Sequence, residues 1–365
     1  MFEIEDEEMK VKRRMDKRRK NDKLFYIALG FLLLTLVLLL IYYFTSNKEE
    51  KKIPVKRPKV VEKKLKIFDE DSNERPIAFM IDNNIGEGRH AGLQDSYINY
   101  EIIVEGGLTR IMAIYKDKEV SLIGPIRSSR HYYLDYALEH DAIYTHYGWS
   151  PYAERDIKAL GVNNVNGMVD GAPFERDRSI AAPHNVFTST SKVRNYLKEK
   201  GYKEESNNWK DFNYSVDEIN LNPKTTTEEE NTNPELKQAN TVSMSYSYSQ
   251  NRSYSYDTNN KYYLRSMNGK AHIDKESNSQ LHYKNIVIIK VNNKTLDREG
   301  RQDLDTTGSG DGYFITNGYA LPIKWSKLSR NSKMNLSYTD GSDVKLNDGN
   351  TFIQIVPLNS NIVIN

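Results

Sequence analysis

Two arginines stand three positions apart in the stretch IGPIRSSRHYYLDYA, residues 123–137. Arg127 and Arg130 follow a Gly-Pro pair and precede an aromatic-rich run with the pattern of a helix over residues 128–139. If Ser128 caps this helix, both cations lie beside its positive end, where a positive charge is unfavourable unless an anion is bound. Two guanidinium groups can hold a carboxylate or a phosphate through paired hydrogen bonds. We therefore predict an anion-binding site at Arg127 and Arg130.

The same two arginines also have a structural interpretation. Glu105, in the stretch VEGG, and Asp170, in MVDGAPFERD, are the acids best suited to pair with them. Arginines that neutralise internal carboxylates stabilise the fold, whereas arginines without such partners are available to a ligand. The sequence leaves both interpretations open, because it does not say where the two carboxylates lie in the folded chain.

Two histidines are candidates for acid–base chemistry. His146 ends the apolar run DAIYTH, so we expect it at the carboxyl end of a strand, where α/β folds place their sites. His184 lies in AAPHNVF, a proline-containing turn ahead of a helix. Paired with Glu105 or Asp170, either histidine would serve an envelope hydrolase or transferase. A non-enzymatic binding protein is the preferred hypothesis, because the chain contains no established catalytic spacing.

The remaining residue types narrow the chemistry further. The chain has no cysteine, which excludes disulfides, thiolate metal sites and cysteine nucleophiles. No metal-ligand spacing and no nucleotide-binding motif occurs, so we expect neither a metal nor a cofactor. Tyr147 and Trp149 adjoin His146, and we assign them to the ligand-binding surface, where aromatic rings stack on sugars. Packing in the core is the alternative for both rings.

An uncharged run of 21 residues, 24–44, has the length of a transmembrane helix. Nine Lys and Arg precede it in residues 10–23, and six follow it in residues 45–60. This difference predicts a cytoplasmic basic tail over residues 1–23 and an extracytoplasmic location for the rest of the chain. A cleaved signal peptide is the alternative, but its apolar core would span only about 7–15 residues. We predict an uncleaved, single-pass anchor in the cell membrane.

The balance of charged residues narrows the classes of molecule that the protein is expected to bind. The chain has 52 Lys and Arg against 50 Asp and Glu, and residues 1–23 hold nine and seven of these. Residues 45–365 therefore carry 43 of each and have no net charge. Because nucleic acid binding requires a basic surface, we expect no nucleic acid partner. The expected partners are the membrane, through one helix, and an anionic cell-wall polymer or an envelope protein.

The region beyond the membrane divides into four parts. Residues 45–74 lack apolar periodicity and are predicted to be a juxtamembrane tether. Residues 75–205 alternate short apolar runs with helical patterns, which predicts an α/β domain. Residues 206–240 are polar and contain prolines, as a connecting loop does. Residues 241–365 alternate apolar and polar positions between turn signals, which predicts an all-β domain.

Local signals locate several elements in these regions. Helices are predicted over residues 150–161 and 188–202, because each pattern opens with serine or threonine and closes with glycine. The run RPIAFMIDN, residues 75–83, predicts a strand that is buried on both faces. In residues 241–257, tyrosine, valine and methionine alternate with serine and threonine, which predicts a hairpin that turns at Gln-Asn-Arg.

An ordered set of motifs points to a known family. RPIAFMIDN, YEIIVEGGLTRIMAIY, IGPIRSSRHYYLDYA, DAIYTHYGWSP and APHNVFTS occur in this order, followed by TTGSGDGYFITNGYALPIKW and LNDGNTFIQIVP. Over residues 75–365 the chain resembles the YerB-like lipoproteins of Gram-positive bacteria, a two-part family of unknown function. The resemblance implies an envelope location and this architecture, but no reaction. The family is typically tethered by a lipidated cysteine, which this chain lacks, so the apolar run must serve as the anchor.

Overall fold

The computed structural model describes residues 2–46, 63–84, 89–210, 212–222 and 233–365. The chain forms two compact units, Met1–Glu62 and Lys63–Asn365. The described part of the first unit is one helix, α1 (Phe2–Ser46), which contains the predicted anchor at 24–44. By length and composition, this helix is apolar enough to cross a membrane.

The second unit begins earlier than predicted. Of the expected tether, 45–74, residues 47–62 lie outside the described residues, but Leu65 and Phe68 are buried. Phe68 packs edge-on against Trp209, with ring centroids 4.8 Å apart. A tether that extends to residue 74 is therefore wrong. One or two apolar residues among charged ones, as in KKLKIFDE at 63–70, have no periodicity by which the sequence could reveal their burial.

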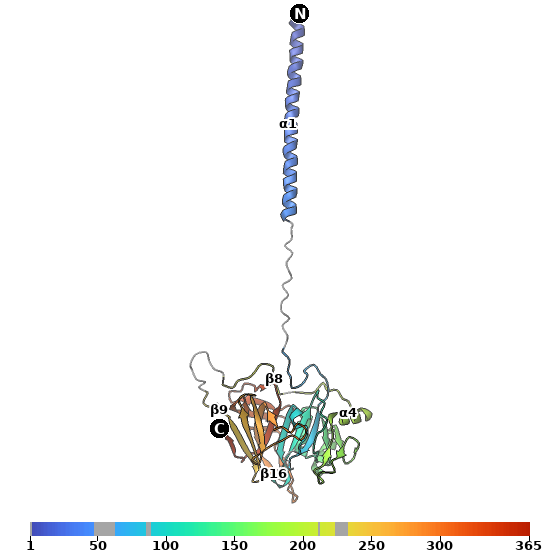
Figure 1. Ribbon diagram of the computed structural model, residues 1–365, viewed down its shortest axis with the longest axis vertical. Helices are drawn as coiled ribbons and strands as arrows, with labels where there is room; N and C mark the ends of the chain where they lie inside the picture. Colours follow the sequence, from blue (N-terminus) through green and yellow to red (C-terminus); the bar gives the residue numbers. More distant parts are fainter. Residues whose placement is uncertain (1, 47–62, 85–88, 211, 223–232) are drawn as a thin grey trace. The chain divides into compact units, whose positions relative to one another are not determined.

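A mixed sheet that runs through both halves of the sequence forms the centre of the second unit (Figure 1). Within the described residues it has eleven strands, and β9 (Lys237–Gln238) pairs with β19 at one end. The other strands run in the order β20 (Asn335–Tyr338), β19 (Tyr319–Lys327), β18 (Gly308–Thr316), β15 (Asn285–Val291), β22 (Thr351–Pro357), β2 (Ile98–Ile103), β3 (Thr109–Tyr115), β1 (Ile77–Asp82), β4 (Ile143–His146) and β5 (Asn164–Asn166). The strand β22 is parallel to both of its neighbours, β15 and β2, and so joins the two regions in one sheet.

The C-terminal region also forms a second sheet, which has six strands in the described part of the chain. Its order is β13 (Lys270–Ala271), β12 (Tyr262–Met267), β11 (Gln250–Asp257), β10 (Thr241–Ser247) and β23 (Ile362–Ile364), with β14 (His282–Tyr283) paired to β12. Short pairs join β16 (Asn293–Thr295) to β17 (Gln302–Leu304), β21 (Leu346–Asn347) to β8 (Tyr214–Ser215), and β6 (Glu175–Arg176) to β7 (Val186–Phe187). The fold is thus a mixed α/β region followed by a strand-rich region, as predicted.

The helices of the second unit are short. They are η1 (Leu93–Asp95), η2 (Glu105–Gly107), η3 (His131–Tyr133), α2 (Leu134–Glu139), α3 (Pro151–Leu160) and α4 (Thr190–Glu199). The helices predicted over 150–161 and 188–202 are confirmed as α3 and α4. The Ser150 hydroxyl accepts the Ala153 N–H at 3.2 Å, and Ser189 caps α4 in the same way.

The helix predicted over 128–139 begins later than expected. Residues 127–129 are not helical, because the N–H of Arg127 donates to Met80 O and that of Ser129 donates to Gly148 O. Helical structure starts with η3 at His131 and continues into the six residues of α2. The expected Ser128 cap is therefore wrong, and Arg127 and Arg130 do not lie on the first turn of a long helix.

The tyrosine- and serine-rich stretch at 241–257 forms the predicted hairpin, β10 with β11. Val242, Met244 and Tyr246 are buried, and the serines between them are partly exposed. The turn lies at residues 248–249, before the predicted Gln-Asn-Arg, which belongs to β11. Period-two alternation therefore identified the strands correctly, although it did not locate the turn.

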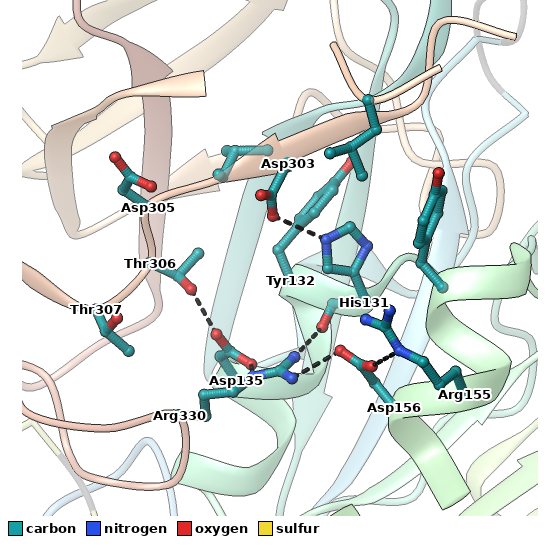
Figure 2. Close-up of a pocket in the computed structure, with 13 residues that line it drawn as sticks. His131, Tyr132, Asp135, Arg155, Asp156, Asp303, Asp305, Thr306, Thr307 and Arg330 are labelled. Atoms are coloured by element: carbon teal, nitrogen blue, oxygen red, sulfur yellow. Dashed lines mark hydrogen bonds and ion pairs between the residues drawn. The ribbon is translucent and has the colours of Figure 1, made fainter. Parts of the chain in front are cut away.

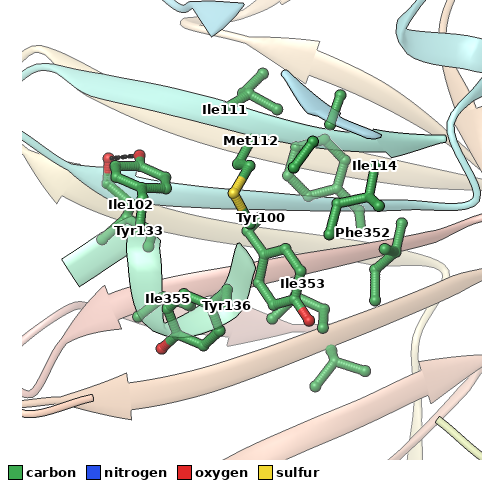
Figure 3. Close-up of a cluster of buried hydrophobic side chains, with 14 of the residues drawn as sticks. Tyr100, Ile102, Ile111, Met112, Ile114, Tyr133, Tyr136, Phe352, Ile353 and Ile355 are labelled. Carbon is green, nitrogen blue, oxygen red and sulfur yellow. Dashed lines mark hydrogen bonds between the residues drawn. The ribbon is translucent and has the colours of Figure 1, made fainter. Parts of the chain in front are cut away.

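Strands from both regions contribute to one continuous core (Figure 3). Every residue of β1, β2 and β22 is buried, as predicted for the run in β1. Tyr136 of α2 stacks on Tyr100 of β2, with ring centroids 4.7 Å apart. Phe352 and Ile353 of β22 belong to the same cluster. The helix α2 therefore covers the part of the sheet where the two regions meet.

A buried ion triad also links the two regions. Glu101 of β2 accepts hydrogen bonds from Arg252 Nε at 2.6 Å and from Arg265 Nη2 at 2.7 Å, and all three side chains are fully buried. Burial alone would favour the neutral acid, but the two guanidinium groups outweigh it and hold the pKa of Glu101 below its usual value. The carboxylate in the first region is thus neutralised by arginines of the second.

We expect Glu101→Gln to lower the free energy of unfolding by about 3–5 kcal/mol, because it leaves two buried cations without a counter-charge. Denaturant unfolding at neutral pH measures this loss. The exposed pair Glu154–Lys158 on α3 provides a control, and Glu154→Gln should change stability by less than about 1 kcal/mol.

The acid dependence gives an independent check. A depressed folded-state pKa contributes stability above the unfolded-state value of about 4.3, and that contribution is lost as the pH falls through the folded-state pKa. Wild type and Glu101→Gln should therefore converge in stability in acid. A difference that persists or grows at low pH would contradict the role assigned to the carboxylate.

Candidate functional site

One edge of the central sheet gathers most of the predicted site residues. The strands β1 and β4 are parallel, and β3 runs antiparallel to β1 and β2, so the ends of β1, β2 and β4 meet the start of β3. Asp82 ends β1 and is paired in register with Arg110 of β3, while Glu105 follows β2 in η2. The edge therefore brings charged groups from three strands to the place where α/β sheets carry their sites.

Arg130 pairs with the acid that the sequence proposed for it. Its Nη2 donates to Glu105 Oε2 at 2.7 Å, and its Nε donates to Oε1, so the two groups form a bidentate pair. Burial opposes ionisation of Glu105, but Arg130 outweighs it and keeps the pKa of this carboxyl below its usual value. Nε, Nη1 and Nη2 of Arg130 therefore all donate to groups within the protein.

Arg127 has weaker contacts than Arg130. Its acidic neighbour is Asp82, which was not among the acids predicted as its partners. Its Nε lies 3.1 Å from Asp82 Oδ2, but the angle does not make a hydrogen bond, and Nη1 reaches Pro183 O only at 3.4 Å. The side chain is 22% exposed. Asp170 does not pair with Arg127; it accepts hydrogen bonds from the Asn166 N–H and the Tyr196 hydroxyl, each at 2.6 Å.

A third arginine, Arg110, completes the cluster. It is nearly buried and donates to Ser128 O. Burial, followed by the positive charges of Arg130 and Arg127, lowers its pKa to about 10. Arg110 was not predicted as a site residue, because it opens the apolar run of β3, where a charged residue is typical of a strand boundary. Among the side chains described at this edge, three guanidinium groups share two carboxylates, Asp82 and Glu105.

The two candidate histidines have different environments. His146 is fully buried, with Nδ1 2.8 Å from Gly148 O and Nε2 3.0 Å from Asn164 Oδ1, and burial lowers its pKa. His184 is 28% exposed, and its Nδ1 lies 2.5 Å from Asp82 Oδ2. The acid beside His184 is therefore Asp82 and not Glu105 or Asp170.

Tyr147 lies next to the arginine cluster. Its N–H donates to Arg127 O at 2.9 Å, and its half-buried ring is covered by the Arg176 guanidinium, 5.1 Å from the ring centroid. Arg176 also donates to the Tyr147 hydroxyl at 3.2 Å. Trp149 is half-buried and packs against His146, with centroids 5.8 Å apart. Both residues thus lie beside the segment of the arginines, Tyr147 through Arg127 and Trp149 through a bridge to Ser129.

A hydrogen-bond chain connects the site to the buried ion triad. Arg265 Nη1 donates to His272 Nδ1, His272 Nε2 lies 2.7 Å from His90 Nδ1, and His90 Nε2 lies 2.5 Å from Asp82 O. Burial is the main cause that lowers the pKa of His90 to about 4 and that of His272 below its usual value. Both rings are thus neutral, and each has one N–H. His272 donates to His90, and His90 donates to the Asp82 carbonyl, which fixes the backbone at the end of β1.

Metal ligands are not gathered at this edge. Within the described part of the chain, no three His, Asp or Glu side chains are grouped so that they could hold a metal ion. The described side chains at the edge are guanidinium groups, two carboxylates, the partly exposed His184 and a tyrosine.

Comparison with known proteins identifies the family. Residues 65–203 match the N-terminal domain, and residues 242–353 the C-terminal domain, of a protein family described as "Protein of unknown function (DUF3048)". A curated relative, "Putative lipoprotein YerB" of Bacillus subtilis (strain 168), is 28% identical over 296 residues, which cover 80% of this chain and 84% of the relative. The chain belongs to the YerB-like family.

A solved YerB structure supports this assignment. The crystal structure of YerB from Bacillus subtilis superposes with a TM-score of 0.67 at 26% identity, over 80% of this chain and 94% of that one. The lipoprotein name of the relative and the apolar helix α1 agree with a membrane-anchored envelope protein. The two matched regions also agree with the predicted order of an α/β part and a strand-rich part.

The different bonding of the two predicted arginines should appear in stability measurements. Arg130→Ala removes both hydrogen bonds to the largely buried Glu105, so it should lower the free energy of unfolding by about 1.5–3 kcal/mol. Arg127→Ala should cost less, because no aligned hydrogen bond to Asp82 is lost. Denaturant unfolding of both variants measures which loss in the free energy of unfolding is larger. Arg298→Ala, at an exposed position, is the control. Equal losses would contradict this account of the cluster.

Proposed function

We propose that this protein is an extracytoplasmic binding protein of the cell envelope, anchored by α1, whose α/β region binds an anionic cell-wall polymer or an acidic partner protein. The carrying observation is the charge balance at the sheet edge, where the three guanidinium groups of Arg110, Arg127 and Arg130 face the carboxylates of Asp82 and Glu105. The pKa of Arg110 is lowered first by burial and then by the charges of Arg130 and Arg127, and an anion bound there would offset this repulsion.

Arg127 is the residue best placed to hold such a ligand. It is partly exposed and has spare donors, whereas Arg130 is occupied by Glu105. Arg176, whose guanidinium lies over the Tyr147 ring, adds a further cation to this surface, and the Tyr147 N–H donates to Arg127 O. We include Trp149 in the neighbouring surface on the basis of its position beside His146. A phosphodiester polymer or an acidic peptide matches this set of donors.

Anion binding can be measured on the full-length protein in a non-ionic detergent. Phosphate should raise the melting temperature of wild type more than that of Arg127→Ala, because the variant lacks one guanidinium fork. The loss of one charged hydrogen-bond pair corresponds to about 1.5–3 kcal/mol, or roughly 10- to 150-fold in affinity. Arg298→Ala serves as the matched control, since its side chain is 94% exposed and pairs with the neighbouring Glu299.

Phosphate also stabilises proteins in general, because it is excluded from their surfaces. The evidence for a site is therefore the difference between the rises in melting temperature of wild type and Arg127→Ala. An equal rise for wild type and Arg127→Ala would refute the anion site. Sedimentation with isolated cell walls, before and after removal of their anionic polymers, then tests the polymer against a protein partner.

An envelope hydrolase or transferase is the second candidate, and the pair His184–Asp82 favours it. A partly exposed imidazole held by a buried carboxylate has the arrangement of a general base. Mass spectrometry of soluble fragments, after incubation of cell walls with wild type or His184→Gln, separates the two functions. Fragments released by wild type alone would support the enzyme, whereas a binding protein releases none.

The orientation in the membrane is also part of the proposal. The nine basic residues of 10–23, against six in 45–60, favour a cytoplasmic N-terminus and an extracytoplasmic body. Protease added to intact, wall-stripped cells should therefore degrade residues 63–365 and spare the N-terminal tail. If residues 63–365 are protected from the protease, the orientation is opposite to the proposed one, and every envelope role proposed for these residues is excluded.

A further inference from the structure

Two neighbouring apolar side chains are exposed in the turn that follows β5. Met168 and Val169 are 70% and 74% exposed. Apolar residues that are exposed singly are ordinary on protein surfaces, but adjacent ones keep a larger apolar area in contact with water, which is unfavourable. The rigidity of this turn and the chemistry of its neighbours determine what the pair can bind.

Hydrogen bonds centred on Asn166 hold the turn in place. The Asn166 side-chain oxygen accepts the N–H groups of Gly148, at 2.9 Å, and Met168, at 3.1 Å. Its backbone carbonyl accepts the N–H of Val169 at 2.8 Å, and its own N–H donates to Asp170 at 2.6 Å. Because these bonds fix the backbone on both sides of the pair, the exposure of the two apolar side chains is a property of the fold.

An aromatic ring connects the pair to the arginines. The Tyr147 ring lies against Gly167 so closely that a Cβ added there would come within 2.3 Å of it, and it meets the Phe174 ring edge-on at 5.7 Å. The Met168 sulfur lies in the same way over the glycine that follows Tyr147. The Arg176 guanidinium is 5.1 Å from the centroid of the Tyr147 ring. We define the turn surface as Met168, Val169, Tyr147, Phe174 and Arg176.

The cation of the turn surface has no acidic partner. Arg176 is exposed, its Nη1 donates to the uncharged Asn185 amide at 2.7 Å, and it forms no ion pair with any residue that the structure describes. Arg330 shows the opposite case, because in the cavity beside α2 it lies between Asp135 and Asp156, which neutralise it (Figure 2). The charge of Arg176 is therefore available to an acidic group of another molecule.

We propose that the turn surface binds an acidic segment of another protein, with an apolar side chain of that segment packed on Met168 and Val169. The inference rests on the proposed function, because it assigns the carboxylates of the segment to Arg127 and Arg176. Methionine, aromatic residues and arginine are the types enriched in protein interfaces, and all three occur here. An anionic wall polymer would pair with the cations but would gain little from two exposed apolar side chains, so the observations favour a protein.

Three libraries of short random peptides displayed on phage provide matched probes. The first combines Asp and Glu with Leu, Ile and Phe, the second replaces the apolar residues with Ser and Thr, and the third replaces the acids with Asn and Gln. The full-length protein in lipid nanodiscs should enrich peptides from the first library only, because only these match both the cations and the apolar pair. No enrichment from the first library, or equal enrichment from either of the others, would overturn the proposal.

Variants locate the binding to the turn surface. The double variant Met168→Ser, Val169→Ser removes the apolar pair and should weaken a synthetic copy of an enriched peptide by about tenfold or more. Its melting temperature should stay unchanged, since both side chains are exposed. The control is Leu328→Ser, at an apolar residue that is 90% exposed in the loop after β19. Unchanged affinity in the double variant, or an equal loss in the control, would exclude the turn surface.

The phosphate and peptide measurements fail separately. If phosphate distinguishes wild type from Arg127→Ala but no peptide of the first library binds, the anion site stands and this inference is overturned, which leaves a wall polymer as the ligand. If the peptides bind and lose affinity in the double variant while phosphate makes no such distinction, the turn surface is supported and the anion site is not.

Discussion

The interaction on which the rest of the structure depends is the buried contact of Glu101 with Arg252 and Arg265. One carboxylate from the first region pairs with two arginines from the second, with no access to water for any of the three. A buried ion loses most of its hydration, so this contact is stable only when all three groups are in place. It therefore specifies how the strand-rich region attaches to the α/β region, beyond what apolar packing around β22 would require.

The triad also controls the candidate site. Arg265 orients His272, His272 orients His90, and His90 holds the carbonyl of Asp82 at the end of β1. The Asp82 carboxylate in turn faces Arg127 and His184. The geometry of a surface site in the first region thus depends on side chains in the second, which gives a physical reason for the two matched regions to occur together in one chain.

Local features of this fold were predictable from sequence, and long-range ones were not. The caps of α3 and α4, the apolar run of β1 and the alternation in β10 and β11 are signals within a few residues, and each gave the correct element. Glu105 was also correctly named as a partner of Arg130. The insertion of β22 and the contacts of Asp82 with Arg127 and His184 join residues 45 or more positions apart, for which no local pattern exists.

The position of β22 between β15 and β2 has a consequence for synthesis. Ile98 pairs with Thr351, which is 253 positions later in the chain. The sheet of the first region cannot close on this side until residues 351–357 have been made and, if the body lies outside the cell, exported. Until then, the apolar edge of β2 stays without its neighbour, and such edges are prone to wrong pairing. An exported chain of this topology benefits from remaining unfolded, or bound to a chaperone, until the residues of β22 emerge.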